Sequence, residues 1–407
     1  MSRIVFLLVL SLAVCAADEV TNWNLRATKA LVAAGIDDIN QTRALAIMHI
    51  AVHDVLNAIE PRYDPYLYER MSEGGSIARV AVAAAAHEAL VALAPSQKQD
   101  IDAGLQMDLA AIADSPQKTA AIRLGQTVAQ AILARRASDG STTKTAARVG
   151  MFPGQWRPTP PELYAAFLPH WGTVTPFGIR SAIEFRADPP PDLGSLEWVA
   201  NYNEVKIYGA EGTSGRTAEQ SDIARFWYET SAQGWNRIAR TVAESRSSGS
   251  IWDTARLFAL VNIALADSYI ASLETKYYYN FWRPVTAIRE GDLDGNPATR
   301  GSLSWSSFLF TPPIPDWPSA HASAGGAATE ALAAYFQSDY IAFSLTSGAP
   351  YPGITRSFYS FSDAALENAH SRVLAGIHFR SASMAGLDQG RKVGKYIVEN
   401  YLRQVRR

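Results

Sequence analysis

The stretch TARLFALVNIALADSYIASLETKYYYNFW, residues 254–282, carries apolar side chains at three- and four-residue spacing along most of its length. Side chains three and four positions apart lie on the same face of an α-helix, so this spacing predicts a long helix. Three further stretches share the pattern and are rich in alanine, which lets helices pack closely: residues 42–59, 78–94 and 118–140. Because strand-like alternation is nearly absent, the sequence predicts an all-α bundle.

Residues 151–195 interrupt the helical stretches with a sequence rich in proline and aromatic side chains. A segment this apolar is unlike a free linker, so we expect an ordered crossing that covers the bundle. The crossing divides the chain into two predicted helical halves, residues 18–195, which include the crossing, and residues 196–407.

The composition is that of a globular protein without a strong overall charge. Of its 407 residues, 48% are hydrophobic and 19% are charged, which is enough apolar sequence to bury a large core. The formal net charge of −2 gives no overall field that would attract nucleic acid or an anionic membrane. We therefore expect no nucleic-acid partner, and any anion site must be built by a few local cations.

The N-terminus has the layout of a secretory signal peptide over residues 1–17, with one arginine, an apolar run over residues 4–14 and then small residues. That run is too short to span a membrane, and no other span is predicted in the mature chain. Cleavage would export the protein to the periplasm or the extracellular space without its only cysteine, Cys15. The alternative is a lipoprotein that is cut before Cys15 and acylated there, although Val14 is bulky for the preceding position.

Three short motifs in the C-terminal half bring together cations, a hydroxyl group and imidazoles. Lys276 and Arg283 are seven residues apart, which is two helical turns, so we predict that they share one helix face. Aromatic residues fill the gap and favour burial of both cations. The tetrapeptide PSAH, residues 318–321, precedes an alanine-rich stretch, where the first turn of a helix offers unpaired N–H groups to an anion. Arg372 and His378 form the third motif, six residues apart.

Each motif alone also has a structural explanation. The cations of the first motif can each form a buried structural ion pair with a carboxylate, and in PSAH the serine can be a helix N-cap and the histidine a surface residue. Together the side chains suit a tetrahedral oxyanion. Guanidinium groups are planar bidentate donors, lysine is a point charge, and a neutral imidazole can attack or coordinate the central atom.

The ordered pattern K-x6-R-P, then P-S-G-H, then S-R-x5-H resembles the signature shared by vanadium-dependent haloperoxidases and the phosphatidic acid phosphatase type 2 superfamily. The chain matches it with Lys276, Arg283 and Pro284, with PSAH, and with Ser371, Arg372 and His378. The similarity to bacterial relatives of the haloperoxidases covers most of the mature chain, including TRALAIMHIAVHDVLNAIEPRY and GIHFRSA. It implies two packed helical bundles of the haloperoxidase and acid phosphatase type, with the site in residues 196–407.

The resemblance implies a role for each matched residue. It makes His378 the axial ligand of vanadium in vanadate, or the nucleophile when phosphate occupies the same site. It makes His321 the acid–base partner on the opposite side, and Lys276 the group that polarises activated peroxide. The residues that would bind the oxyanion are Lys276, Arg283, Ser319, Ala320, Arg372 and His378.

Two departures from the family pattern bear on activity. Ala320 replaces the glycine of P-S-G-H; it keeps the backbone donor but disfavours a positive φ, and we expect binding to survive. Ala382 stands where the family often places an aspartate that holds the ligating histidine. Loss of such a partner weakens a site, so we expect Ser381, Ser383 or a backbone carbonyl to replace it, or activity to be poor.

The resemblance therefore implies an enzyme that oxidises halide with hydrogen peroxide at a histidine-bound vanadate. One alternative is a phosphatase that hydrolyses a phosphomonoester through a phosphohistidine, because vanadate mimics phosphate. A second alternative is an oxyanion-binding helical protein without catalysis. Similarity outside the shared motifs and the predicted export favour the haloperoxidase over the membrane-spanning lipid phosphatases.

Other polar and aromatic residues are interpreted as structural. His49 and His53 have the spacing of a zinc pair but no third ligand nearby, so we expect a packed, hydrogen-bonded pair. The loop at 289–301 resembles a calcium loop, yet Pro297 replaces its sharp-turn glycine, so we interpret it as an ordinary polar loop. Asp316 can tune the site electrostatically. Four residues can line the rim of the pocket but are more simply explained by packing: His170, Trp282, Trp317 and Phe379. Spacing alone assigns no role to His87 or His370.

Overall fold

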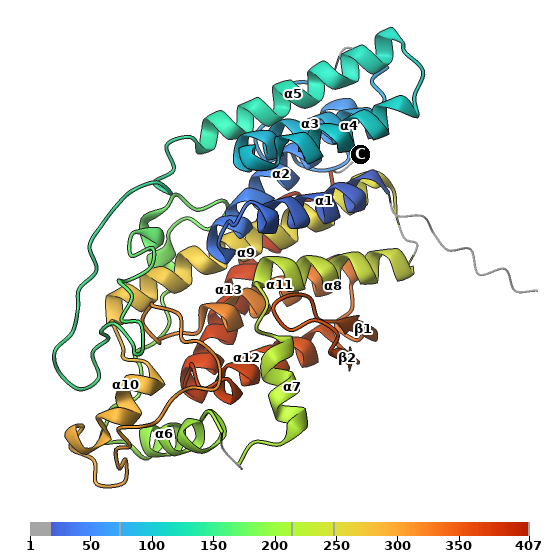
Figure 1. Cartoon of the computed structure of the whole chain (residues 1–407). Coiled ribbons are helices and arrows are strands. Elements are labelled where there is room, and N and C mark those ends of the chain that lie inside the picture. The colour runs from blue at the N-terminus through green and yellow to red at the C-terminus, as the bar shows by residue number, and fades with distance from the viewer. Residues whose placement is uncertain (1–17, 73–74, 213–214, 247–248, 406–407) are drawn as a thin grey trace, which may run out of the picture.

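The computed structural model describes residues 18–72, 75–212, 215–246 and 249–405 (Figure 1). The predicted signal peptide, Cys15 included, lies outside the described residues, so export and lipidation stay predictions. The division of the chain into two halves at residue 195 also stays a prediction.

The fold is mainly helical, which confirms the all-α class predicted from periodicity. The α-helices are α1 Glu19–Ala33, α2 Asp38–Ile59, α3 Ala78–Leu93, α4 Lys98–Ala110, α5 Pro116–Arg136, α6 Leu196–Tyr208, α7 Ala218–Phe226, α8 Ser231–Arg246, α9 Ile251–Tyr279, α10 Pro284–Arg289, α11 Ala320–Phe336, α12 Phe361–Leu374 and α13 Arg380–Asn400. Short 3-10 helices occur at η1 Pro95–Gln97, η2 Trp171–Thr173, η3 Ala182–Phe185 and η4 Gly291–Leu293. A single antiparallel hairpin among the described residues joins β1 Phe343–Thr346 to β2 Thr355–Phe358.

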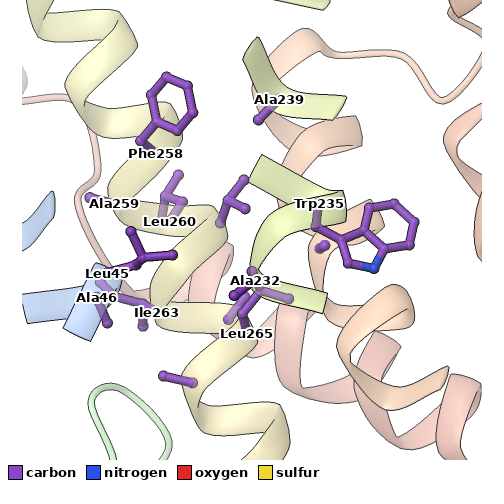
Figure 2. Close-up of a cluster of buried hydrophobic side chains, with 14 of the residues drawn as sticks. Leu45, Ala46, Ala232, Trp235, Ala239, Phe258, Ala259, Leu260, Ile263 and Leu265 are labelled. Carbon is purple, nitrogen blue, oxygen red and sulfur yellow. The ribbon is translucent and has the colours of Figure 1, made fainter. Parts of the chain in front are cut away.

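Helix α9 is the central element of the core. It packs against α2 on one side and against α11 and α13 on the other, as Figure 1 shows. Figure 2 shows the contact region, where Leu45 of α2 lies beside Leu260 of α9 and Ala232 of α8 lies beside Leu265 of α9. Each fully buried leucine side chain stabilises the fold by roughly 1.5–3 kcal/mol. The periodic stretch at 254–282 therefore organises both sets of helices.

The length and apolar composition of α9 alone would allow it to cross a membrane. Among the described residues, the only other candidate is the bent pair Ala78–Leu93 and Pro95–Ala110, taken as one broken span. The apolar window of α9 is 94% buried by the surrounding helices, as in the core helix of a helical protein.

Helices α11 and α13 approach backbone to backbone. A Cβ atom at Gly390 would lie 1.8 Å from the carbonyl oxygen of Ser323, and one at Gly386 would lie 2.2 Å from that of Ser319. The amide of Ser319 also donates to the carbonyl of Ala382 at 2.9 Å. These contacts hold the PSAH tetrapeptide against the first turns of α13, next to the third motif.

The crossing at 151–195 is ordered, as expected, without an α-helix of its own. The buried carboxylate of Asp267 on α9 accepts hydrogen bonds from the amides of Phe177, Gly178 and Ile179 at 2.6–2.8 Å. The amide of Trp156 donates to the carbonyl of Asn280, just beyond the end of α9. Backbone groups of the crossing are therefore paired with α9 and the residue that follows it.

Candidate oxyanion site

The structure brings the three sequence motifs together at the ends of four helices. Lys276 lies in the last turn of α9, and Arg283 is the N-cap residue of α10. The prediction that they share a helix face is wrong, because α9 ends at Tyr279 and Asn280 adopts a left-handed conformation with φ 52°. Both side chains nevertheless bind the same short segment, residues 314–316, directly before PSAH.

Both cations are fully buried, as the aromatic residues between them predicted. Lys276 Nζ donates to the carbonyls of Pro315 at 2.7 Å and Asp316 at 2.9 Å. Arg283 Nε donates to Ile314 at 2.7 Å. Burial, together with the mutual repulsion of the two cations, lowers the pKa of Lys276 well below its usual value. Burial also lowers the pKa of Arg283 to about 10. An anion bound nearby would favour the charged form of both groups.

Arg372 closes the other side of the site from the end of α12. Its Nη1 donates to the carbonyl of Trp227 at 3.2 Å, and its guanidinium lies 5.8 Å from the ring centroid of Tyr228. Trp227 and Tyr228 belong to the turn between α7 and α8 and were not predicted as part of the site. Their backbone and ring contacts follow from packing, which no sequence motif marks.

Ser319 is the N-cap of α11, and its Oγ accepts a hydrogen bond from the amide of Ala322 at 3.3 Å. The hydroxyl proton remains available for an acceptor, because an N-cap serine uses only its oxygen. Ala320 begins the helix and is not among the residues with positive φ. Alanine therefore suits this position, and its Cβ requires no strained backbone.

Both ring nitrogens of His378 have a close polar neighbour, and the contact at Nε2 defines its tautomer. Arg283 Nη1 lies 3.0 Å from Nε2, and because a guanidinium can only donate, Nε2 carries the lone pair and Nδ1 the proton. Nδ1 lies 2.8 Å from Oδ1 of the buried Asp316, an ion-pair distance, although the ring N–H is not aligned for a hydrogen bond. Burial and the neighbouring cations lower the pKa of His378 well below 6.5. The ring is therefore neutral, with Nε2 as its basic atom.

Asp316 occupies the role for which Ser381 and Ser383 were candidates. The hydroxyl groups of both serines are buried without a partner among the described residues. Asp316 instead reaches His378 from the segment before PSAH, 62 residues away in the sequence. Burial raises the pKa of Asp316 to about 7, against the opposing effect of Arg283 and Lys276.

His321 is partly buried in the first turn of α11. Its Nε2 lies 2.8 Å from the carbonyl of Trp227, and its Nδ1 lies 3.0 Å from Ser231 Oγ. Burial and the charge of Arg372 lower the pKa of His321 well below 6.5. Arg372 and His321 thus share one carbonyl acceptor, which places them on the same side of the site.

The donor set fits an oxyanion because part of it has no partner in the protein. Nη2 of Arg283 and Nε of Arg372 are buried and find no acceptor among the described residues. A buried donor left unpaired costs about 1–3 kcal/mol, and more when it is charged. A vanadate or phosphate ion would supply oxygens to these groups and to the Ser319 hydroxyl, and Nε2 of His378 would supply a ligand to vanadium.

The remaining histidines and aromatic residues have structural partners. His49 Nε2 lies 2.7 Å from the amide nitrogen of Asn24, and His53 lies 3.1 Å from Asp54. His87 pairs with Asp102 at 2.8 Å, and His170 contacts the carbonyl of Ser141. Trp282 and Phe379 pack around Trp198 in a buried aromatic cluster, Trp317 donates to the carbonyl of Asp188, and His370 lies near Arg380 and Glu204. In the loop at 289–301, Asp294 accepts from Trp198 and Thr299.

The chain is similar in sequence and in fold to known proteins. Residues 256–407 match the VCPO second helical-bundle domain, a range that contains every predicted site residue. A vanadium chloroperoxidase of Curvularia inaequalis is 27% identical over 287 residues, which are 54% of this chain and 46% of that protein. A bacterial vanadium-dependent iodoperoxidase superposes with a TM-score of 0.83 at 26% identity, covering 96% of this chain and 97% of its own.

The chain belongs to the vanadium haloperoxidase family. The holo form of a bacterial vanadium-dependent chloroperoxidase shares the fold of this family member, with a TM-score of 0.71 at 18% identity over 96% of this chain and 93% of its own. The predicted packing of two helical bundles is thereby confirmed. The alignment spans less than half of the length of the curated relative.

Proposed function

We propose that this protein is an exported vanadium-dependent haloperoxidase that oxidises halide with hydrogen peroxide. The observation that carries the proposal is the tautomer of His378. Its basic Nε2 faces Arg283, and its opposite nitrogen faces the carboxyl of Asp316. A metal-binding histidine in proteins has this arrangement, with a carboxylate behind the ring that fixes its orientation and raises its basicity.

Vanadate bound at His378 would supply a Lewis acid that activates hydrogen peroxide for attack by halide. The side chains of the protein would bind the oxyanion and transfer protons. Lys276, Arg283 and Arg372 balance the negative charge of the oxyanion, and the Ser319 hydroxyl donates to one of its oxygens. His321 accepts a proton from hydrogen peroxide and returns it when water leaves.

The competing activity is phosphomonoester hydrolysis, which the same donors would support. His378 Nε2 would attack phosphorus, the bond to the alkoxide would break, and His321 would protonate the departing oxygen. Water would then release phosphate from the histidine. Asp316 favours this reaction as well, because a carboxylate at Nδ1 stabilises the positive charge that forms on the ring.

The test compares both reactions on purified protein freed of bound anions. We expect hydrogen-peroxide-dependent oxidation of iodide, bromide or chloride only after addition of orthovanadate, and loss of this turnover in His378→Ala. The matched control is His87→Ala, because His87 lies on α3, which packs on α2, α4 and α5 and carries none of the site residues. Hydrolysis of p-nitrophenyl phosphate that vanadate inhibits would instead show a phosphatase. If neither reaction occurs but phosphate and vanadate still bind, the protein is a non-catalytic oxyanion-binding member of the family.

A further inference from the structure

A buried chain of hydrogen bonds leads away from His321 and involves none of the residues proposed to bind the oxyanion. Ser231 Oγ lies 3.0 Å from His321 Nδ1. Tyr269 Oη lies 2.9 Å from Ser231 Oγ and 2.5 Å from Asp38 Oδ2. The four groups come from four helices, α11, α8, α9 and α2, so only the tertiary fold connects them.

The two middle members of the chain are almost inaccessible to solvent, whereas its ends are less deeply buried. Ser231 is 2% exposed and Tyr269 is 4% exposed. His321 and Asp38 are partly buried. Asp38 is also fixed in place, because the amides of Ser231 and Ala232 at the start of α8 both donate to its carboxylate at 3.1 Å. The chain thus runs from the site to a carboxyl group nearer the surface.

The proton positions in the chain follow from donor and acceptor chemistry. The Trp227 carbonyl can only accept, so Nε2 of a neutral His321 carries the proton and Nδ1 the lone pair. Ser231 then donates its proton to Nδ1, and its oxygen accepts from Tyr269. The Tyr269 hydroxyl lies within donor reach of both Ser231 Oγ and Asp38 Oδ2, and a continuous relay requires that it donates to Ser231 while Asp38 carries a proton.

Halide oxidation consumes one proton, because hydrogen peroxide, halide and H⁺ give hypohalous acid and water. Resting on the proposed function, we propose that Asp38, Tyr269 and Ser231 deliver this proton to Nδ1 of His321. In one transfer, the O–H bonds of Asp38, Tyr269 and Ser231 break, new O–H bonds form on Tyr269 and Ser231, and an N–H bond forms on His321. His321 then gives one ring proton to the oxygen that leaves as water, and the carboxylate left on Asp38 takes up a proton from solvent.

The two ends of the chain differ in their charged neighbours: Arg372 opposes protonation of His321, and a bound oxyanion would offset that charge. Arg372 faces His321 across the shared Trp227 carbonyl, and His378 is close enough to interact electrostatically with His321. Asp37 and Glu229, the latter paired with Arg237, are the charged neighbours of Asp38. Burial raises the pKa of Asp38, and burial together with Asp38 raises the pKa of Tyr269 well above 10. Ser231, Tyr269 and Asp38 are positioning residues, since they act through His321.

Two readouts test the relay. In vanadate-free protein with ¹⁵N-labelled histidine, His321 should show a protonated Nε2 and an unprotonated Nδ1, and Ser231→Ala should shift the Nδ1 signal. In the vanadate-loaded enzyme, Tyr269→Phe and Ser231→Ala should lower kcat by about tenfold or more, with KM for halide and vanadate affinity unchanged. The kcat of these variants should become proportional to proton concentration and rise with the concentration of a small buffer acid. Ser231→Thr should restore most of the rate.

The controls are Tyr401→Phe and Ser268→Ala. Each removes a hydroxyl that donates to a backbone carbonyl, of Gly178 and Leu265, outside the chain. If Ser231→Ala and Tyr269→Phe keep the wild-type kcat and pH profile, or if Nδ1 of His321 is protonated, the relay is wrong while the proposed function stands. If the wild-type protein has no haloperoxidase turnover, the proposed function fails and the relay fails with it.

Discussion

The substitution Asp316→Asn separates vanadate binding from simple anion binding. This change keeps the shape of the side chain and removes the charge that lies 2.8 Å from Nδ1 of His378 and 3.9 Å from Nη1 of Arg283. Loss of a carboxylate behind a metal-binding histidine typically lowers metal affinity 10–100-fold, which is about 1.4–2.8 kcal/mol. This loss applies to vanadate, because vanadium requires the histidine nitrogen as a ligand.

A second effect has the opposite sign. Two like charges about 6 Å apart repel by roughly 3 kcal/mol at an effective dielectric constant of about 20, and the carboxylate of Asp316 would repel a bound oxyanion through the same interaction. Removing the charge of Asp316 therefore strengthens the binding of any anion in the site, phosphate and vanadate alike. The absolute vanadate affinity of Asp316→Asn depends on which effect is larger, but the repulsion cancels in the ratio of the two affinities. We expect the vanadate-to-phosphate affinity ratio to fall about 10–100-fold.

Isothermal titration calorimetry of anion-free protein with orthovanadate and with phosphate measures this ratio. The titrations belong near pH 8.5, because the pKa of Asp316 is raised to about 7 and the wild-type carboxyl must be ionised. Asp294→Asn is the control, since it removes a half-buried carboxylate that bonds Trp198 and Thr299 in the loop at 289–301. An unchanged ratio in Asp316→Asn, with both affinities shifted equally, would refute the assignment of Asp316 as the partner of His378.

Three further substitutions test the anion site at Arg372, the buried His49 and the packing of α11 against α13 at Gly390. In Arg372→Lys, no side-chain donor replaces the unpaired Nε of the arginine. The substitution should therefore weaken phosphate and vanadate binding equally, about 10–100-fold in the same titration. Unchanged phosphate affinity would place Arg372 outside the anion site. Burial lowers the pKa of His49 to about 3, so as the pH falls below 6.5 the unfolded chain gains a proton that the folded chain does not. Folding stability then falls by about 1.4 kcal/mol per pH unit, or about 2 kcal/mol at pH 5, and urea unfolding of His49→Gln at pH 7 and pH 5 should lack this contribution; parallel pH dependence in both proteins would contradict it. Gly390→Ala places a methyl group against the carbonyl of Ser323 and should destabilise the fold by about 1–3 kcal/mol or more in thermal unfolding, whereas an unchanged melting temperature would mean that α11 and α13 pack less closely than described.

The helices could be predicted from the sequence because their periodicity is strong and local. Helices α2, α3, α5 and α9 begin and end within a few residues of the predicted stretches. The exception is the C-terminal end of α9, where the pattern of apolar residues continues to Trp282 but the helix stops at Tyr279. The left-handed conformation of Asn280 and Pro284 at the start of α10 end the helix, and hydrophobic periodicity does not register either of them.

The family motifs gave the site residues, but not the groups that orient them. Asp316 was noted only as an electrostatic influence, because its contact with His378 depends on the close approach of α11 and α13 at Gly386 and Ser319. Ser231, Tyr269 and Asp38 have no spacing in common. The one available signal was a polar pair, Ser268 and Tyr269, inside an otherwise apolar helix, and such a pair indicates a buried hydrogen-bond partner without naming it.

The two histidines of the site differ in the nitrogen that the fold leaves basic. Arg283 can only donate, so His378 keeps its lone pair on Nε2, while the Trp227 carbonyl can only accept, so His321 keeps its lone pair on Nδ1. Behind His378 lies a carboxyl group that fixes the ring, whereas His321 contacts a hydroxyl group that can both give and take a proton. A ligand must hold its lone pair towards the metal, and an acid–base catalyst must exchange protons with its surroundings. The surroundings of each ring therefore suit it to one role, and the chemical identity of the residue, histidine in both cases, does not decide between them.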